Sequence, residues 1–324
     1  MYNNASVIIE DKSLMVNYFS RSLFIYPVVL FLVLSSCATD LNRIQFAEEY
    51  ANLGGAYIKL GDMDGAISYL KRSLELNERD TETQFNLAFA FFSNKEIRKA
   101  QIILENLYSG DPRNIRVLEL QAVAFQSANQ FTAALNKYKE LLEIQPENSL
   151  ARYNSAILLW DVNKPNLAIA ELKALLEFYP NDKEALYNLG VFYFESGELS
   201  NAAMILSRYL EKDPNDVDVL LVLARVENRR SKFVESLSAF DMAINLLPEE
   251  DSRLRVIYFE RATILLTKVE DPKAGLIALE KSFSKGFRDF EKISGLLKVD
   301  GLLEKQKVFD LVTSYNLDVT EQDP

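Results

Sequence analysis

The 324-residue sequence contains no histidine and only one cysteine, Cys37. Without histidine, most general acid–base mechanisms and most zinc sites are removed. A single cysteine can form neither an internal disulfide nor a cysteine metal cluster. The eleven glycines are scattered among expected turns and helix crossings, so they form no phosphate-binding loop. We therefore expect no cofactor, no metal site and no catalytic residue.

Basic side chains are also in short supply. Lys and Arg number 36 against 47 Asp and Glu, for a net charge of −11. Nucleic-acid binding depends on cations that neutralise phosphates, so we expect no nucleic-acid partner. The acidic excess is interpreted as a solubilising surface, with an acidic patch for a basic partner as the alternative. No spacing singles out a catalytic carboxylate pair, and we do not expect an enzyme.

An apolar run near the N-terminus predicts a targeting signal. Residues 23–34, LFIYPVVLFLVL, are shorter than the roughly 20 residues that span a bilayer, but they suit a signal-peptide core. The adjoining segment Leu34-Ser35-Ser36-Cys37 resembles a bacterial lipobox, whose cysteine is lipidated and becomes the mature N-terminus. We expect a signal peptide over 1–36, fatty acylation of Cys37 (with palmitate among the chains) and a short tether over 37–46. A chance cysteine and an uncleaved membrane helix are the alternatives.

Two details refine this expectation. Glu10 and Asp11 are unusual in the basic region of a signal, whereas a start at Met15 leaves only MVNYFSRS, with Arg21 as its positive charge, before the apolar run. Whether translation begins at Met1 or Met15 stays open. Ala38 follows the cysteine, and by analogy with enteric bacterial sorting this favours the outer membrane, with the protein facing the periplasm. The expected location is the bacterial cell envelope.

Five prolines that stand 34 residues apart show that the chain is a repeat array: Pro112, Pro146, Pro180, Pro214 and Pro248. A period of 34 with two apolar stripes at helical spacing is typical of helix–turn–helix repeats. Six repeats run without a gap: 47–80, 81–114, 115–148, 149–182, 183–216 and 217–250. The eighth position is small in every repeat, because two helices approach closely only where no side chain intrudes. Large residues such as Leu53 at position 7 are expected to fill the remaining gap between the helices.

This pattern resembles the tetratricopeptide repeat (TPR) family over residues 47–289. The resemblance implies an all-α, right-handed α-α superhelical solenoid of about seven helix pairs with a C-terminal capping helix. The seventh repeat is displaced to 256–289 by an insertion at 251–255. Residues 290–324 are expected to form the cap and tail, since a terminal repeat otherwise exposes an apolar face.

The resemblance also implies an inner face, made by positions 2, 5, 6, 9, 12 and 13 of each first helix. An asparagine column at position 6 can pair with a peptide backbone, because an amide both donates and accepts hydrogen bonds. Aromatic side chains at neighbouring positions are favoured at binding surfaces. The predicted partner-binding residues are Asn52, Asn86, Tyr153, Asn154, Trp160, Tyr187, Asn188 and Phe194. The alternatives are that asparagine is simply common at this position and that the aromatics pack between adjacent helices.

The function expected from these features is that of a membrane-anchored scaffold. Its inner face would bind a protein or peptide segment, in cell-envelope assembly by fold-level analogy alone. The basic clamp by which some TPR domains capture acidic chaperone termini is absent. The alternative is a structural protein that self-associates through its outer surface, with enzymatic activity a distant third. The partner, the pathway, the membrane leaflet and the oligomeric state stay open.

Overall fold

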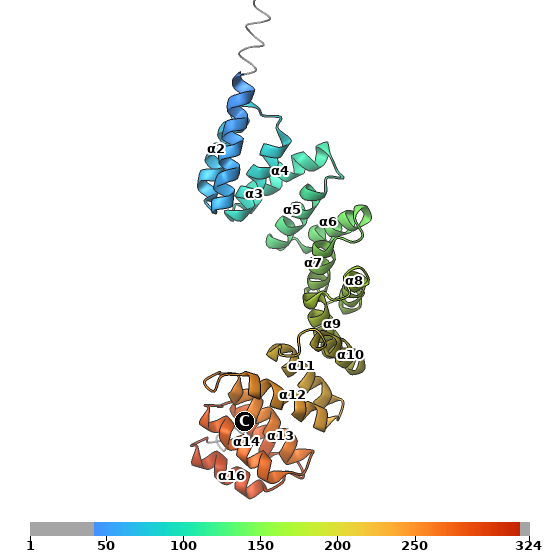
Figure 1. Ribbon diagram of the computed structural model, residues 1–324, viewed down its shortest axis with the longest axis vertical. Coiled ribbons are helices and arrows are strands. Elements are labelled where there is room, and N and C mark those ends of the chain that lie inside the picture. The colour runs from blue at the N-terminus through green and yellow to red at the C-terminus, as the bar shows by residue number, and fades with distance from the viewer. Residues whose placement is uncertain (1–41, 318–324) are drawn as a thin grey trace, which may run out of the picture. The chain divides into compact units, whose positions relative to one another are not determined.

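The computed structural model describes residues 42–317, and every regular element in this range is a helix (Figure 1). The predicted signal peptide and Cys37 lie outside the described residues. Contacts divide the chain into two compact parts, one that ends at Pro146 and one that begins at Glu147. We call them the N-terminal part and the C-terminal part and describe each by itself.

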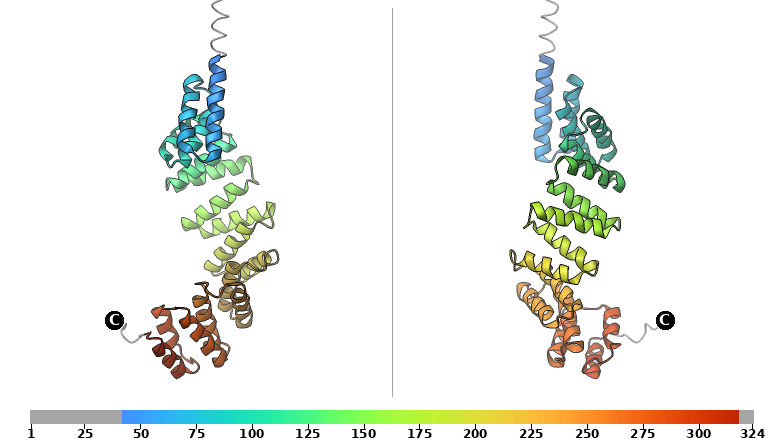
Figure 2. Two further views of the ribbon diagram at one scale, coloured as in Figure 1. Left: turned by 60° about the vertical axis from the view of Figure 1, so that its left-hand side comes forward. Right: turned by 90° about the vertical axis from the view of Figure 1, so that its right-hand side faces the viewer.

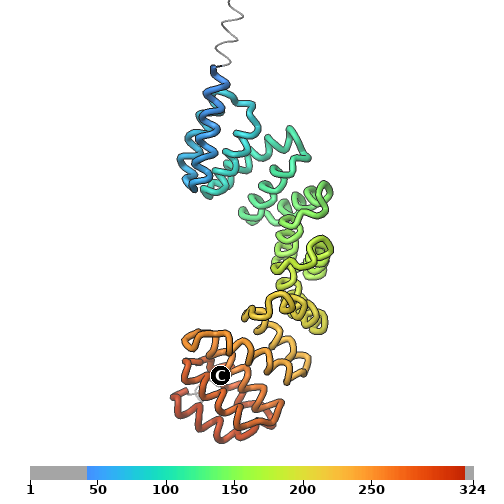
Figure 3. Tube along the Cα trace, viewed as in Figure 1, coloured from blue at the N-terminus to red at the C-terminus, as the bar shows by residue number. Residues whose placement is uncertain are grey.

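Short turns join consecutive helices within each part (Figures 2 and 3). The N-terminal part contains a first helix over residues 42–60, α2 (Met63–Leu76), α3 (Thr81–Ser93), α4 (Ile97–Gly110), α5 (Ile115–Ser127) and α6 (Phe131–Ile144). The C-terminal part contains α7 (Ser149–Asp161), α8 (Pro165–Phe178), α9 (Lys183–Glu195), α10 (Leu199–Leu210), α11 (Val217–Arg229), α12 (Phe233–Leu246), α13 (Leu254–Thr267), α14 (Pro272–Ser284), α15 (Phe290–Leu297) and α16 (Lys305–Ser314). The solenoid fold class predicted from the repeats is confirmed.

The last residue of each of the first five repeats starts the next helix. These N-cap residues are Asp80, Asn114, Asn148, Asp182 and Asp216. Each side chain accepts a hydrogen bond from a backbone N–H in the first turn, which satisfies a donor that has no partner within the helix. The 34-residue period therefore fixes where the first helix of each following repeat begins.

A left-handed residue closes the turn between the two helices of every repeat. Its positive φ values occur at Gly61, Lys95, Asn129, Asn163, Gly197, Ser231 and Glu270. The first six are spaced by 34 residues. The interval from Ser231 to Glu270 is five residues longer than that. The insertion before the seventh repeat therefore leaves the turn geometry intact and only delays it.

Close helix crossings explain the small residues at position 8. A Cβ added to Gly190 in α9 would lie 2.5 Å from Cδ2 of Leu206 in α10, and Leu206 is fully buried. Ala88 and Ala224 occupy the same position in other repeats and are also fully buried. Since each crossing has space for at most one methyl group, larger residues are excluded there.

The expectation that Leu53 fills the gap between paired helices is wrong. Its side chain is 44% exposed, whereas Leu87 and Leu189 at the equivalent position are 5% and 1% exposed. In the N-terminal part, Leu87 of α3 packs with Ile67 and Leu70 of the preceding α2. Position 7 thus faces the preceding repeat, and the first repeat has no described repeat before it.

The C-terminal helices α15 and α16 complete the core of the last repeat. Ile293, Val308 and Val312 of these helices are buried against Phe259 of α13 and Leu279 of α14. The segment between α15 and α16 is held by a hydrogen bond from Leu303 N to the carbonyl of Leu266, 3.2 Å long. This end of the array therefore buries its apolar face within the chain.

Candidate partner-binding surface

A groove of about 590 Å³ lies along the first helix and α3 in the N-terminal part. The small residues Ala51 and Gly55 line it and leave room between the helices. Asn52 and Asn86 line the same groove, Asn52 exposed and Asn86 half-buried. The structure therefore brings two of the predicted residues, from consecutive repeats, into one groove that is open to a peptide.

Charged residues line this groove and form an ion pair next to it. Glu48 and Lys59 line the groove at positions 2 and 13 of the first repeat. Glu82 of α3 pairs with Arg116 of α5 across 2.7 Å, and the Arg116 guanidinium lies 4.1 Å from the centre of the Phe85 ring. Phe85 is thus covered by its neighbour, which favours the packing alternative for this aromatic residue.

In the C-terminal part, two predicted residues bind each other. Asn188 Nδ2 donates to the Tyr153 hydroxyl at 3.1 Å and to the carbonyl of Glu184 at 2.9 Å. Tyr153 belongs to α7 and Asn188 to α9, so the bond links the first helices of consecutive repeats. The amide donors of Asn188 are therefore engaged within the wall of the array, and a partner would have to compete for them.

Tyr187 and Asn154 are half-buried on the same helices. Burial is the main cause that raises the pKa of Tyr187, and the carboxylates of Asp218 and Asp216 add to it. The phenol therefore stays protonated at neutral pH and can donate a hydrogen bond to a carbonyl. Tyr187 is the predicted aromatic residue with the best-preserved capacity for a polar contact.

Trp160 lies flat on Phe192 of the next repeat. The two ring centres are 4.0 Å apart and the rings are inclined by 4°. Phe192 is buried, whereas Trp160 keeps a partly exposed ring. One face of the indole is thus used in packing between α7 and α9, and only the remainder can meet a partner.

Phe194 departs from the expectation of an open aromatic contact. Its side chain is only 9% exposed. The exposed Arg229 of α11 places its guanidinium 4.3 Å from the centre of the Phe194 ring. A cation over an aromatic face is favourable, and here it shields the ring from a partner.

Cations on the inner face were not among the predicted residues, although their positions in the repeat could have identified them. Arg225 and Arg229 stand at positions 9 and 13 of the sixth repeat. Arg225 Nε bonds both carboxylate oxygens of Glu260 in α13, at 3.2 and 3.0 Å. This pair joins the sixth repeat to the seventh.

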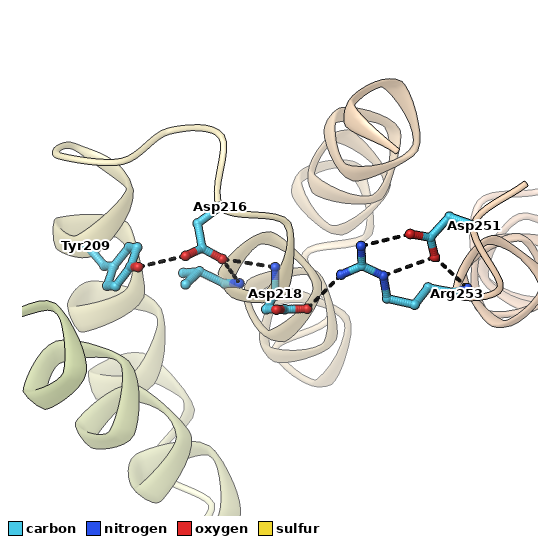
Figure 4. Close-up of polar contacts among 6 residues, drawn as sticks. Tyr209, Asp216, Asp218, Asp251 and Arg253 are labelled. Carbon is cyan, nitrogen blue, oxygen red and sulfur yellow. Dashed lines mark hydrogen bonds and ion pairs between the residues drawn. The ribbon is translucent and has the colours of Figure 1, made fainter. Parts of the chain in front are cut away.

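Figure 4 shows a second polar connection between repeats of the C-terminal part. The Tyr209 hydroxyl donates to Asp216 at 2.7 Å, while the other oxygen of Asp216 caps α11. Arg253, in the insertion before the seventh repeat, bonds Asp218 of α11 at 3.0 Å and also holds Asp251 of the same insertion. The links lie at successive turns and fix the spacing of these repeats.

Two other features, a metal site and a membrane span, are absent from residues 42–317. In that range no cluster of carboxylate or thiol side chains has the grouping of a metal site. Nor does that range include a helix with the length and apolar character that a bilayer crossing requires. The lipid-anchor prediction for Cys37 lies outside the described residues.

Two segments of the chain, residues 57–124 and 153–217, match the tetratricopeptide repeat family. Among curated proteins, BBSome complex member BBS4 of Bos taurus is 30% identical over 102 residues, which cover 32% of this chain and 19% of the relative. BBSome complex member bbs-4 of Caenorhabditis elegans is 24% identical over 152 residues, which cover 44% and 33%. The chain therefore matches a third or less of the length of these relatives.

Solved structures give the same fold. A tetratricopeptide repeat protein from Parabacteroides merdae aligns with a TM-score of 0.53 at 20% identity, over 78% of this chain and 98% of that chain. PilF of Pseudomonas aeruginosa aligns with a TM-score of 0.52 at 19% identity, over 64% and 94%. Tetratricopeptide repeat proteins mediate protein–protein interaction and are typically scaffolds without enzymatic activity. With these two matches and the 34-residue period, residues 57–124 and 153–217 of this chain are identified as tetratricopeptide repeats.

Proposed function

We propose that the protein is a membrane-anchored scaffold that binds an extended segment of a partner polypeptide on its inner face. The carrying observation is the groove in which Asn52 and Asn86 stand on consecutive repeats. Their amides can donate to and accept from a peptide backbone whatever its sequence. Binding of this kind uses no chemistry, and the anchor holds it at a membrane surface.

Residues of the C-terminal part are proposed as a separate binding surface. Tyr187 is half-buried and protonated, and Asn154 is half-buried on the neighbouring helix. Tyr153 and Asn188 bond each other, and Trp160 stacks on Phe192 of the next repeat. These residues therefore join consecutive repeats, and only their remaining exposed surface can contact a partner. Because these links are in place before a partner arrives, the surface is preorganised and little side-chain entropy is lost on binding.

The anchor and the location form the finer part of the proposal. Fatty acylation of Cys37 would hold the protein on a membrane, since several acyl chains together give firm binding. The lipobox and Ala38 favour the periplasmic face of the outer membrane, and the role is in cell-envelope assembly. Membership of the curated relatives in a named complex is consistent with an assembly role.

A matched set of variants tests the groove. Asn52→Ala, Lys59→Ala and Asn86→Ala, all in the groove, are combined in one protein, and the control carries Met204→Ala on α10, where the side chain is 61% exposed. Partners are recovered by cross-linking in cells followed by mass spectrometry. Loss of a partner from the triple variant alone supports the proposal. Recovery of the same partners at the same yield by the triple variant and the wild type rejects it.

A second candidate function is self-association through the outer surface. It is favoured by exposed apolar side chains on the second helices, namely Ile102, Met204 and Val234, which are 65%, 61% and 73% exposed. Sedimentation of the purified protein distinguishes the two. A stable oligomer that is lost on Met204→Lys would favour self-association, whereas a monomer would exclude it.

A further inference from the structure

The first helix carries a stripe of exposed apolar side chains along one side. Phe46, Leu53 and Leu60 are spaced by seven residues, so they share one face of the helix. Their side chains are 56%, 44% and 78% exposed. Several exposed apolar side chains that share one helix face are typical of an interaction surface.

Comparison with the next repeat shows that this exposure is not a property of the repeat itself. Ala56 at position 10 is exposed, whereas Ala90 at the same position is fully buried. Leu53 and Leu87 differ in the same sense, because Leu87 packs on the preceding α2. The face of the first repeat is therefore a complete repeat interface that lacks a described occupant.

Tyrosines extend the stripe onto α2. The ring of Tyr69 lies 6.3 Å from Tyr50 and 5.1 Å from Tyr57, with both pairs stacked. Tyr50 and Tyr69 line a hollow of about 560 Å³ together with Arg72. The face thus combines aliphatic and aromatic side chains with an arginine, and we call these residues the first-repeat face.

We propose that the first-repeat face rests on the interface of a lipid bilayer, as a second membrane contact beside the anchor. The proposal builds on the lipid anchor of the proposed function. Tyr, Phe and Leu with Arg nearby form the composition that settles between headgroups and acyl chains. The charges of the first helix, Arg43, Lys59, Glu48 and Glu49, cancel, so this helix itself presents no net charge to a membrane surface.

The length of chain before the first helix favours lipid over other occupants. Cys37 precedes Asn42 by five residues. Five residues extend to at most about 18 Å, so acyl chains on Cys37 would keep the first helix next to the bilayer. A face held at that distance meets lipid at a high effective concentration, whereas a second copy or a soluble partner has to be recruited.

The test uses tryptophan emission from the full-length protein in vesicles that contain lipids brominated on their acyl chains. The single native tryptophan is replaced by Trp160→Phe, and Leu60→Trp or, as the control, Met204→Trp is added. An interfacial helix buries its apolar face roughly 5–10 Å deep. The brominated lipids should therefore reduce the emission of Leu60→Trp by at least about twofold. Met204→Trp, on α10, should keep its emission.

Each other result has a defined meaning. If the protein floats with vesicles but the emission of Leu60→Trp is unquenched, the face does not touch lipid and the proposal is wrong, while the anchor stands. A blue-shifted, unquenched emission assigns the face to a second copy or to residues 23–34 and also overturns the proposal. If Cys37→Ser removes fatty-acid labelling but quenching persists, the face binds lipid by itself. If Cys37 is never labelled and quenching still occurs, the anchor is wrong and the face proposal survives.

Discussion

Two adjacent glycines of the first helix allow a sharp test of how the repeats pack. A Cβ added to Gly54 would lie 2.5 Å from Cγ and 2.7 Å from Cδ2 of Leu70, whereas a Cβ added to Gly55 would meet nothing within 4 Å. Leu70 is fully buried, so its side chain could shift only together with the residues that enclose it. The two positions differ in packing but share one helix and the same intrinsic propensity.

The expected magnitudes follow from these distances. Gly→Ala inside a helix gains about 0.5–1 kcal/mol in free energy of unfolding, because the unfolded chain loses freedom. Gly55→Ala should therefore stabilise the protein by that amount. Gly54→Ala has the same gain, but overpacking against Leu70 costs about 1–3 kcal/mol. It should consequently be about 1–3 kcal/mol less stable than Gly55→Ala.

Urea unfolding followed by far-ultraviolet circular dichroism measures the difference. Because repeat arrays can unfold in parts, hydrogen exchange of the amides in α2 should be measured as well. Faster exchange in Gly54→Ala and slower exchange in Gly55→Ala would agree with the packing described. Equal stabilisation by both substitutions would refute the close crossing of the first helix and α2.

Three further predictions concern other parts of the chain. Asp216→Ala should lower the free energy of unfolding more than Asp182→Ala does. Each substitution removes a helix cap worth about 0.5–2 kcal/mol, but only Asp216 also accepts a hydrogen bond from Tyr209. Equal losses, measured by urea unfolding, would contradict this. The pKa of Asp251 is lowered, chiefly by a hydrogen bond from the neighbouring guanidinium, so the unfolded chain takes up the proton first as the pH falls. The stability that Asp251 contributes is thus complete above the pKa of the unfolded state and is lost as the pH falls through the pKa of the folded state. Asp251→Asn should flatten that part of the stability–pH curve. An unchanged curve would count against the ion pair. Finally, Cys37→Ser should abolish metabolic fatty-acid labelling, and persistent labelling would exclude the lipobox.

The helix pairs were predictable because the residues that pack where two helices cross recur every 34 positions. Small residues recur at position 8 since two helices cross there, as Gly190 and Leu206 show. The turns were less visible, because only Gly61 and Gly197 mark them with glycine, whereas Lys95 and Glu270 adopt the same left-handed conformation. Neighbouring helices hold these residues in place despite a cost of about 1–2 kcal/mol for leaving the preferred region.

The side chains of the inner face were harder to assign. Periodicity places Phe194 on that face, but it does not show that Arg229 of the next repeat covers the ring. In the same way it selects Tyr153 and Asn188 separately and does not reveal the bond between them. Such contacts join residues about 35 positions apart, and only the angle between consecutive repeats decides whether they meet.

Site-specific photo-cross-linking in cells is the most direct test of partner binding on the inner face. A photoreactive phenylalanine analogue replaces Tyr187 in one protein, Asn86 in a second and the outward Met204 in a third. Partner binding on the inner face predicts that each of the first two cross-links to a partner, mapped by mass spectrometry, and that the third does not. Cross-links from the outer position alone would contradict it, as would products that map only to other copies of this chain.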